Sequence, residues 1–279
     1  MNIDEQIIHT TIRIISLRAD GLTSTGTGFF YRYDIANKQV PVIVTNKHVV
    51  KDSVKLVLKF SVASNDSFVQ GDSQTINMDN PKGLLINHPD DNVDLCLIKI
   101  APILNLKLQK KMHIVFLTKE NVITDEYISN NISNIENITT IGYPNGIIDE
   151  YNNLPIVRRG ITATSLKYDF NNNKEFLIDS AIYNGSSGSP VFIFNQGSYS
   201  IGNSLYAGDR CLLVGIVYAV MLHTVNGELK IKEVPVTSVP VAESRIPNNL
   251  GVVIKACKLF DFENIIDEIL KAEETVKLS

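Results

Sequence analysis

A serine within a run of small residues is the first candidate for chemistry in this 279-residue chain. Ser187 lies in the run NGSSGSP (184–190), and the apolar run VFIF follows at once. A serine that attacks a carbonyl needs an exposed oxygen and backbone N–H groups that point at the developing oxyanion. Gly185 and Gly188 tolerate positive φ and permit the tight turn that aims those groups. The plainer alternative is a Ser/Gly turn that only joins two strands.

His48 and Asp94 are the candidate partners of this serine. His48 follows the apolar run VPVIV in the segment TNKHVV, so we expect it at a strand end that holds its ring rigidly as a general base. Asp94 precedes the apolar run LCLI, so its carboxylate should be partly buried and should need a partner such as an imidazole N–H. The alternative for Asp94 is a turn acid, which is what we expect of Asp90 and Asp91. A metal site at these three aspartates is disfavoured, because the D-x-D-x-D-G spacing and distal Glu of a calcium loop are missing.

The remaining histidines lack such a context. We expect no role for His9, His113 or His223. His88 lies in the acidic segment NHPDD and is the one rival for the role of general base.

Short β-branched runs between turn signals predict about eleven strands that must position these residues. Their ranges are 11–17, 28–33, 40–45, 54–60, 95–100, 139–142, 156–162, 176–178, 190–194, 212–218 and 251–255. The exception is the C-terminus, where apolar residues recur with helical spacing after Asp261, which can cap a helix. These residues are Phe262, Ile265, Ile266, Ile269 and Leu270. The sequence therefore predicts an all-β protein with one C-terminal amphipathic helix over 261–276.

Composition excludes several classes of function. The net charge is −4, so the chain is not a basic nucleic-acid binder, and 44% apolar residues supply a real core. No apolar stretch is long enough to span a membrane, and acidic residues on the polar face of the C-terminal helix would be repelled by anionic lipid. The three cysteines, Cys96, Cys211 and Cys257, form neither a disulfide framework nor a zinc motif. The acidic N-terminus is unlike a signal peptide, so we expect a cytoplasmic protein.

The three candidates follow one another as His48, Asp94 and Ser187, at separations of 46 and 93 residues. This is the order of chymotrypsin, whose separations are about 45 and 93, and not that of subtilisins or α/β-hydrolases. The chain resembles the trypsin-like (chymotrypsin-fold) serine peptidases, especially the bacterial branch with HtrA-type and glutamyl-endopeptidase-type enzymes. The segments that carry the resemblance are GTGFF (26–30), TNKHVV (45–50), VDLCLIKI (93–100), IGYP (141–144), GSSGSP (185–190), VGI (214–216) and NLGVVIKA (249–256).

The resemblance implies a fold and a set of roles. It implies a single domain, 1–279, of two six-stranded Greek-key barrels, over about 1–125 and 126–258, with the helix at 261–276. Ser187 is the implied nucleophile, His48 the general base and then acid, and Asp94 the residue that fixes the His48 tautomer. The N–H groups of Gly185 and Ser187 form the implied oxyanion hole. The implied reaction is hydrolysis of a peptide bond in a protein or peptide through an acyl-enzyme, with no cofactor and no metal. The alternative is a catalytically silent binding module of the same fold.

The resemblance also places a specificity pocket. Its base is six residues before the nucleophile, at Ala181 and then Ile182, and the opposite wall is the segment 216–219, which is Ile216, Val217, Tyr218 and Ala219. None of these residues is charged, so we expect a shallow apolar pocket for small or medium uncharged side chains. A preference for Glu would instead point to His223.

We expect the protein to be regulated differently from the animal digestive enzymes and from the full HtrA proteins. Animal digestive relatives carry an Asp at the position of Ser186, which pairs with an N-terminus freed by cleavage. Its absence implies that an N-terminal cut is not the switch here. Control would fall to a regulatory protein partner or to the loops 101–138, 145–154, 195–210 and 222–248. We also expect the chain to lack the PDZ domain of full HtrA proteins, and with it their regulation.

Overall fold

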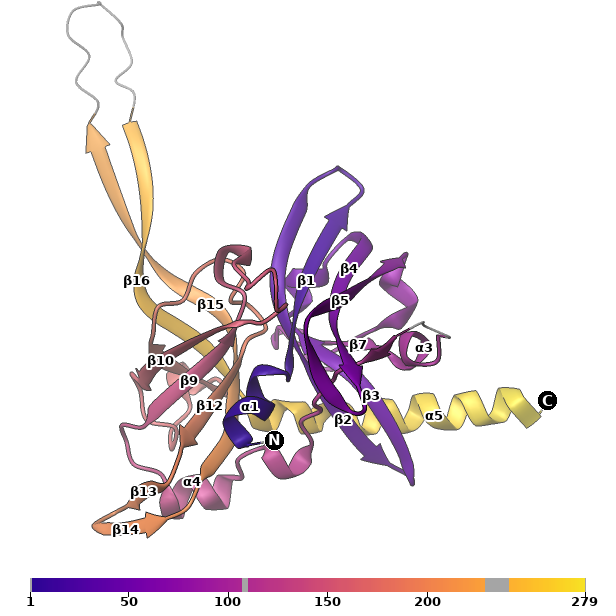
Figure 1. The fold of residues 1–279 in the computed structure, drawn as a ribbon. Coiled ribbons are helices and arrows are strands. Elements are labelled where there is room, and N and C mark those ends of the chain that lie inside the picture. The colour runs from indigo at the N-terminus through magenta and orange to yellow at the C-terminus, as the bar shows by residue number, and fades with distance from the viewer. Residues whose placement is uncertain (1, 107–109, 229–240, 279) are drawn as a thin grey trace, which may run out of the picture.

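The computed structural model describes residues 2–106, 110–228 and 241–278, and strands dominate it (Figure 1). The N-terminal half is an eight-stranded antiparallel sheet in the order β5-β4-β1-β2-β3-β7-β6, with β8 paired to β4. Its strands are β1 (Thr11–Arg18), β2 (Thr23–Ile35), β3 (Lys38–Thr45), β4 (Ser53–Ser64), β5 (Ser67–Asp79), β6 (Leu85–Asn87), β7 (Cys96–Lys99) and β8 (Lys111–Met112). Within the described residues this sheet does not close into a ring. The two edge strands of the sheet are β5 and β6. The 3-10 turn η1 (Pro81–Leu84) joins them along the chain, and its first residue is a proline, which has no N–H to donate.

The C-terminal half is a closed six-stranded barrel in the order β10-β11-β16-β15-β12-β9. Its strands are β9 (Asn137–Gly142), β10 (Ile156–Thr162), β11 (Glu175–Asp179), β12 (Pro190–Asn195), β15 (Arg210–Glu228) and β16 (Val241–Lys255). A separate hairpin is formed by β13 (Ser198–Ile201) and β14 (Ser204–Ala207). The predicted all-β class with two barrel-like halves is therefore confirmed. The first half differs in detail, since it has eight strands rather than six and does not close.

The C-terminal helix is also confirmed. A 3-10 turn, η5 (Ala256–Phe262), leads into α5 (Glu263–Leu278), which lies along the N-terminal sheet in Figure 1. Phe262 and Ile266 are buried in a hydrophobic cluster that also contains Phe29 of β2 and Phe192 of β12. Burial of this apolar stripe thus joins the two halves and the helix in one core. None of the described helices combines the length and the apolar character needed to cross a bilayer.

Several segments expected to be loops contain regular structure. Residues 101–138 include α3 (Ala101–Leu104), β8, η2 (Lys119–Asn121) and α4 (Asp125–Asn131), and residues 195–210 contain the β13-β14 hairpin. Most of 222–248 belongs to β15 and β16, which run out from the barrel as a two-stranded ribbon (Figure 1). Residues 229–240 of that expected loop lie outside the described residues. The strands of the sheet fall within 11–112 and those of the barrel within 137–255, on either side of the proposed boundary near 125.

Candidate active site

His48 and Asp94 meet because two paired strands end at the same edge of the N-terminal sheet. Thr45, the last residue of β3, pairs with Cys96, the first residue of β7. His48 follows β3 in the short helix α2 (Lys47–Val50), and Asp94 directly precedes β7. His48 Nδ1 contacts Asp94 Oδ2, and the His48 backbone N–H donates to Asp94 Oδ1 at 3.1 Å. The carboxylate therefore holds both the ring and the backbone of His48.

This contact determines which ring nitrogen of His48 carries the proton. A neutral ring that faces a carboxylate through Nδ1 carries its proton there, which leaves Nε2 as a proton acceptor. The His48 side chain is 48% exposed and that of Asp94 is 24% exposed, so the base faces solvent while its partner is shielded. Asp94 is therefore partly shielded, and its carboxylate has the His48 imidazole as a partner.

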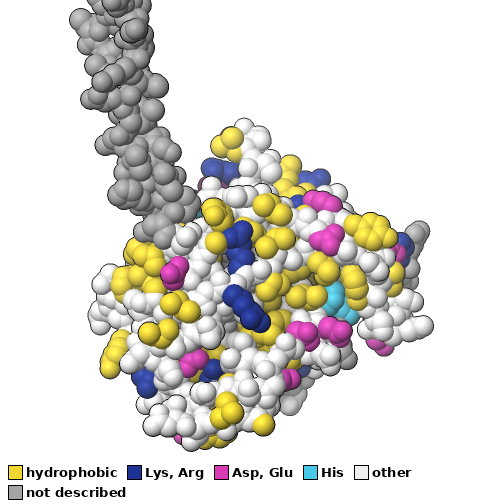
Figure 2. Space-filling model, turned by 60° about the vertical axis from the view of Figure 1, so that its left-hand side comes forward, with side chains coloured by type: hydrophobic (Ala, Val, Ile, Leu, Met, Phe, Trp, Pro, Cys, Tyr) yellow, Lys and Arg dark blue, Asp and Glu magenta, His cyan; other side chains and the backbone are white. Residues whose placement is uncertain are grey.

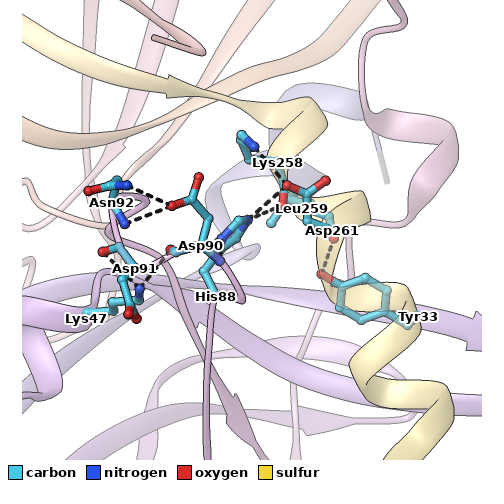
Figure 3. A network of polar contacts seen from close by, with 9 residues as sticks. All are labelled: Tyr33, Lys47, His88, Asp90, Asp91, Asn92, Lys258, Leu259 and Asp261. Carbon is cyan, nitrogen blue, oxygen red and sulfur yellow. Dashed lines mark hydrogen bonds and ion pairs between the residues drawn. The ribbon is translucent and has the colours of Figure 1, made fainter.

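The two segments that carry this pair are also tied to each other. Asn46 Nδ2 donates to the carbonyl of Asp94 at 2.6 Å. Lys47 Nζ donates to the carbonyl oxygens of Asp90 at 3.1 Å and Asp91 at 3.4 Å, as Figure 3 shows. These bonds flank His48 and Asp94 and restrict how far they can separate.

His88 anchors the same segment from its other side (Figure 3). The backbone N–H of Asp90 donates to His88 Nδ1 at 3.0 Å, so the proton of the neutral ring lies on Nε2. Nε2 is 3.3 Å from both the Lys258 carbonyl and Asp261 Oδ2. Burial lowers the pKa of His88 from its usual value of 6.5. Both ring nitrogens are thus engaged, and His88 has a structural role rather than that of a rival general base.

Ser187 lies on a turn that is held by the N-terminal half of the molecule. The backbone N–H of Thr27 in β2 donates to the Ser187 carbonyl at 2.8 Å, and the Thr27 hydroxyl donates to the Gly185 carbonyl at 2.9 Å. Gly188 has a φ of +88°, and a Cβ there would lie 1.9 Å from the Thr27 carbonyl. Only glycine allows that approach. Thr27 is a positioning residue that sequence reasoning missed, since its partners are some 160 positions away.

Two peptide groups of this turn are fixed with their N–H groups free. The carbonyl of Asn184 accepts from the Asn145 N–H at 2.5 Å, and the carbonyl of Ser186 accepts from the Ser189 N–H at 3.0 Å. In a trans peptide the C=O and N–H point in opposite directions. The N–H groups of Gly185 and Ser187, which belong to these two peptides, are therefore directed away from Asn145 and Ser189. Neither donates a hydrogen bond within the described part of the chain.

The Ser187 hydroxyl donates to the Tyr218 carbonyl at 3.4 Å. Among the described residues no hydrogen bond joins it to His48. The Tyr218 hydroxyl in turn donates to Glu175 Oε1 at 2.9 Å, and burial together with this bond raises the pKa of Tyr218. The structure thus brings His48 and Asp94 into contact and seats Ser187 on an ordered turn, but leaves its hydroxyl bonded to the backbone of β15.

The expected specificity pocket is only partly accessible. Ile182, Ile216 and Val217 are at most 3% exposed and belong to hydrophobic clusters, so they offer little surface to a ligand. Ala181, Tyr218 and Ala219 are half-buried and remain candidates for its lining.

The residues expected to line this pocket are uncharged, but an arginine from another strand contacts one of them. Arg158 of β10 donates through Nη1 to the Ala181 carbonyl at 2.9 Å. The prediction considered only the segments around 181 and 216, and β10 is remote from both in sequence. The side chain of His223, the fallback candidate, lies outside the described part of the structure.

No group of His, Cys, Asp and Glu side chains among the described residues is arranged to hold a metal ion. Asp94 is engaged with His48, and Asp90 Oδ1 accepts from the Asn92 N–H at 2.9 Å. The three cysteines are unpaired, and burial raises the pKa of Cys96 and of Cys211 to about 12. Thiols with such pKa values are poor nucleophiles near neutral pH.

The fold is all-β, with a His–Asp pair at the edge of one half and a serine turn in the other half. This combination is that of the chymotrypsin-fold proteases. The chain belongs to the family of trypsin-like peptidase domains, whose family model matches residues 26–200. No curated protein matches the sequence.

Similar solved structures include three proteases or protease paralogues. The Rv3671c protease from M. tuberculosis, in its active form, is 14% identical with a TM-score of 0.42, over 90% of this chain and 78% of that one. The catalytically active tobacco etch virus protease with product is 15% identical with a TM-score of 0.46, over 79% and 72%. The inactivated protease paralogue S-I1 of the scabies mite is 11% identical with a TM-score of 0.47, over 96% and 97%.

Proposed function

We propose that the chain is a serine endopeptidase in which Ser187, His48 and Asp94 form a catalytic triad. The observation that carries the proposal is the contact of His48 Nδ1 with Asp94, which leaves Nε2 free to accept a proton. The ordered serine turn supports it, since its two free N–H groups at Gly185 and Ser187 form a ready oxyanion hole. The family match to residues 26–200 spans all three residues of the triad.

The proposed reaction begins when the Ser187 hydroxyl leaves the Tyr218 carbonyl by rotation about its Cα–Cβ bond and donates to His48 Nε2. Ser187 Oγ then bonds to the substrate carbonyl carbon while His48 takes its proton, and Asp94 stabilises the imidazolium. The carbonyl oxygen becomes an oxyanion held by Gly185 N–H and Ser187 N–H. His48 returns the proton to the leaving amine as the C–N bond breaks. Water repeats the steps on the acyl-enzyme and releases the acid, so no cofactor is needed.

We further propose that an N-terminal cut is not needed for activity. Ser186 stands where digestive relatives have Asp, and its hydroxyl accepts from the Tyr183 N–H at 3.3 Å. Its own N–H donates to the Tyr183 carbonyl at 3.0 Å, so residues of the turn itself hold Ser186. We also propose that the protein belongs to the bacterial HtrA-like branch, is cytoplasmic and is controlled by a protein partner.

The Ser187 bond to Tyr218 is also compatible with the second candidate, a catalytically silent binding module of the same fold. Hydrolysis of a fluorogenic peptide library by the purified full chain separates the two. We expect turnover that Ser187→Ala reduces by at least about 10⁴-fold while Ser200→Ala, an exposed serine on β13, leaves it unchanged. A folded protein that cleaves no peptide, or cleaves equally well as Ser187→Ala, contradicts the proposal.

A further inference from the structure

Arg158 is an arginine directed at the interior of the C-terminal barrel. Along β10 the side chains of Val157, Arg159 and Ile161 are exposed, so the even-numbered residues face inward, as alternation along a strand requires. At Gly160 on that inner face, a Cβ would lie 2.1 Å from the Asp179 carbonyl and 2.8 Å from Ser180 Cβ. The inner face of β10 is therefore pressed against the segment that leads from β11 to the serine turn.

The guanidinium of Arg158 contacts that same segment but is not neutralised by it. Nη1 donates to the Ala181 carbonyl at 2.9 Å, and the guanidinium carbon lies 5.0 Å from the centre of the Tyr183 ring. Nε is buried and has no hydrogen-bond partner among the described residues. No carboxylate pairs with Arg158 in the part of the chain that the structure describes. A guanidinium has five N–H donors, and leaving them unpaired in a shielded place costs free energy.

Arg210 shows how a structural arginine of this barrel is accommodated. Its Nη2 donates to Glu136 at 2.9 Å, its Nε donates to Asn195 Oδ1 at 2.9 Å, and its guanidinium carbon lies 4.8 Å from the centre of the Tyr199 ring. Both arginines thus lie over a tyrosine ring, but only Arg210 has a carboxylate partner. Arg158 lacks the anion that would complete the same arrangement.

The position of Arg158 indicates where that anion comes from. Ala181 is the expected base of the specificity pocket, and Tyr183 lies four residues before Ser187 on the same segment. Figure 2 shows one face of the molecule, on which Lys and Arg side chains lie near the centre among hydrophobic side chains and a histidine lies farther to the right. The unpaired cation is therefore joined to the base of the pocket beside the proposed nucleophile.

We propose that Arg158 is the specificity-determining residue of the site and selects substrates with an acidic side chain, Glu or Asp, immediately before the cleaved bond (the P1 residue). This rests on the proposed function. A P1 carboxylate can accept two hydrogen bonds from N–H groups of the planar guanidinium that the Ala181 carbonyl does not engage. A neutral Gln of the same shape satisfies fewer of these donors, and a P1 Lys or Arg is repelled by the like charge.

The first measurement needs no variant. The purified full chain is given matched peptides that differ only in P1, with Glu, Asp, Gln, Leu or Lys. We expect kcat/KM for Glu to exceed that for Gln by about 30-fold or more, and Lys to be the poorest. A wild-type enzyme that prefers Leu, or treats Glu and Gln alike, overturns the inference but leaves the proposed peptidase function standing.

Two neighbouring arginines supply the matched variants. Arg158→Gln should abolish the preference for Glu over Gln, whereas Arg159→Gln, one residue along on the exposed face, should retain it. Labelling by a fluorophosphonate probe, which does not use the P1 pocket, shows whether each variant keeps a working serine. If Arg158→Gln labels normally and still prefers Glu, the role of Arg158 is wrong. If the wild-type protein neither labels nor cleaves any peptide, the proposed function fails and this inference fails with it.

Discussion

In the N-terminal sheet, His48 and Asp94 come together because β3 and β7 are neighbours that end at one edge. In the C-terminal barrel, the Ser187 turn and its pocket instead depend on contacts from outside their own strand. The turn is bonded to Thr27 of the other half, and Arg158 reaches the Ala181 carbonyl from β10. The first arrangement lies within one sheet and is partly exposed, whereas the second joins several strands and both halves of the molecule and is largely buried.

The His48–Asp94 pair and the serine turn therefore make different demands on the surrounding structure. The base and its aspartate need only a shared sheet edge, and they can be changed without disturbing a core. The serine turn needs its peptide groups at fixed orientations, because free N–H groups bind an oxyanion only when they are already aimed. Substitutions of His48 or Asp94 should therefore affect chemistry alone, whereas substitutions under the serine turn should affect chemistry and stability together.

The largest loss of activity is expected for substitutions of His48 and Asp94. His48→Ala should reduce kcat/KM by about 10⁵-fold, and Asp94→Asn by about 10⁴-fold because the ring loses its fixed tautomer. Both side chains are partly exposed, so the melting temperature should barely change. Peptide hydrolysis and thermal unfolding measure the two quantities. Asp91→Asn, the exposed acid three residues before Asp94, serves as the control and should be unchanged. An active Asp94→Asn enzyme would remove Asp94 from the site.

A substitution under the serine turn should have a smaller effect on activity but should also lower stability. Thr27 is fully buried, and its hydroxyl donates to the Gly185 carbonyl and accepts from the Tyr143 N–H at 3.0 Å. Thr27→Val should lower the free energy of unfolding by about 2 kcal/mol, because two buried groups lose their partner. It should also slow peptide hydrolysis by about 10- to 100-fold, as the turn relaxes. Thr25→Val on the exposed end of β2 is the matched control. Loss of stability with full activity would show that Thr27 does not position the turn.

Acid should weaken the N-terminal sheet first. Burial and the neighbouring His113 lower the pKa of His9 from 6.5 to about 4. Because the folded pKa is lower than the unfolded one, this group contributes stability that is fully present above pH 6.5 and is lost as pH falls toward 4. The loss is at most ~1.4 kcal/mol per pH unit for one group. Hydrogen exchange at pH 7 and pH 5 should show faster opening of β4 and β5 than of the barrel.

His9→Phe provides the control for this acid effect, since it keeps a ring between Phe68 and His113, whose ring centres lie 4.7 and 4.5 Å away. It should flatten the pH dependence of the melting temperature. If the slope is unchanged, other groups are responsible for it.

The smallest effect concerns thiols. With their pKa values raised to about 12 by burial, Cys96 and Cys211 are almost wholly protonated at pH 8. Iodoacetamide should therefore leave hydrolysis unchanged, and thiol reductants should do the same. Inactivation by iodoacetamide that parallels loss of a single thiol would favour a cysteine-type mechanism over the proposed one.

The sequence was most informative where structure is local. The strand ends at Thr45 and Cys96 follow from apolar runs, whereas the meeting of His48 with Asp94 was expected from the family resemblance and depends on the pairing of β3 with β7. The helix α5 likewise follows from the period of its apolar residues. Strand β5 was missed because its sequence is largely polar, and β13 and β14 were missed because each has only four residues and they form a separate hairpin.

The roles of Thr27 and Arg158 could not be predicted from local pattern. In the sequence VRRG, two arginines in a row read as an exposed stretch of strand, and only the closure of the barrel decides which one faces inward. Thr27 is one of several small polar residues in β2, and its importance arises from a partner on the other half of the chain. The roles of Thr27 and Arg158 thus depend on how distant strands pair and pack, and not on residue type alone.

The central claim is that Ser187 is a nucleophile activated by His48. The most direct test is to treat the full chain with a fluorophosphonate and to locate the adduct by tandem mass spectrometry. We expect one adduct per molecule on Ser187, formed without prior cleavage, absent in Ser187→Ala and strongly slowed in His48→Ala. A folded protein that gains no adduct, or gains it on another residue, would contradict the claim.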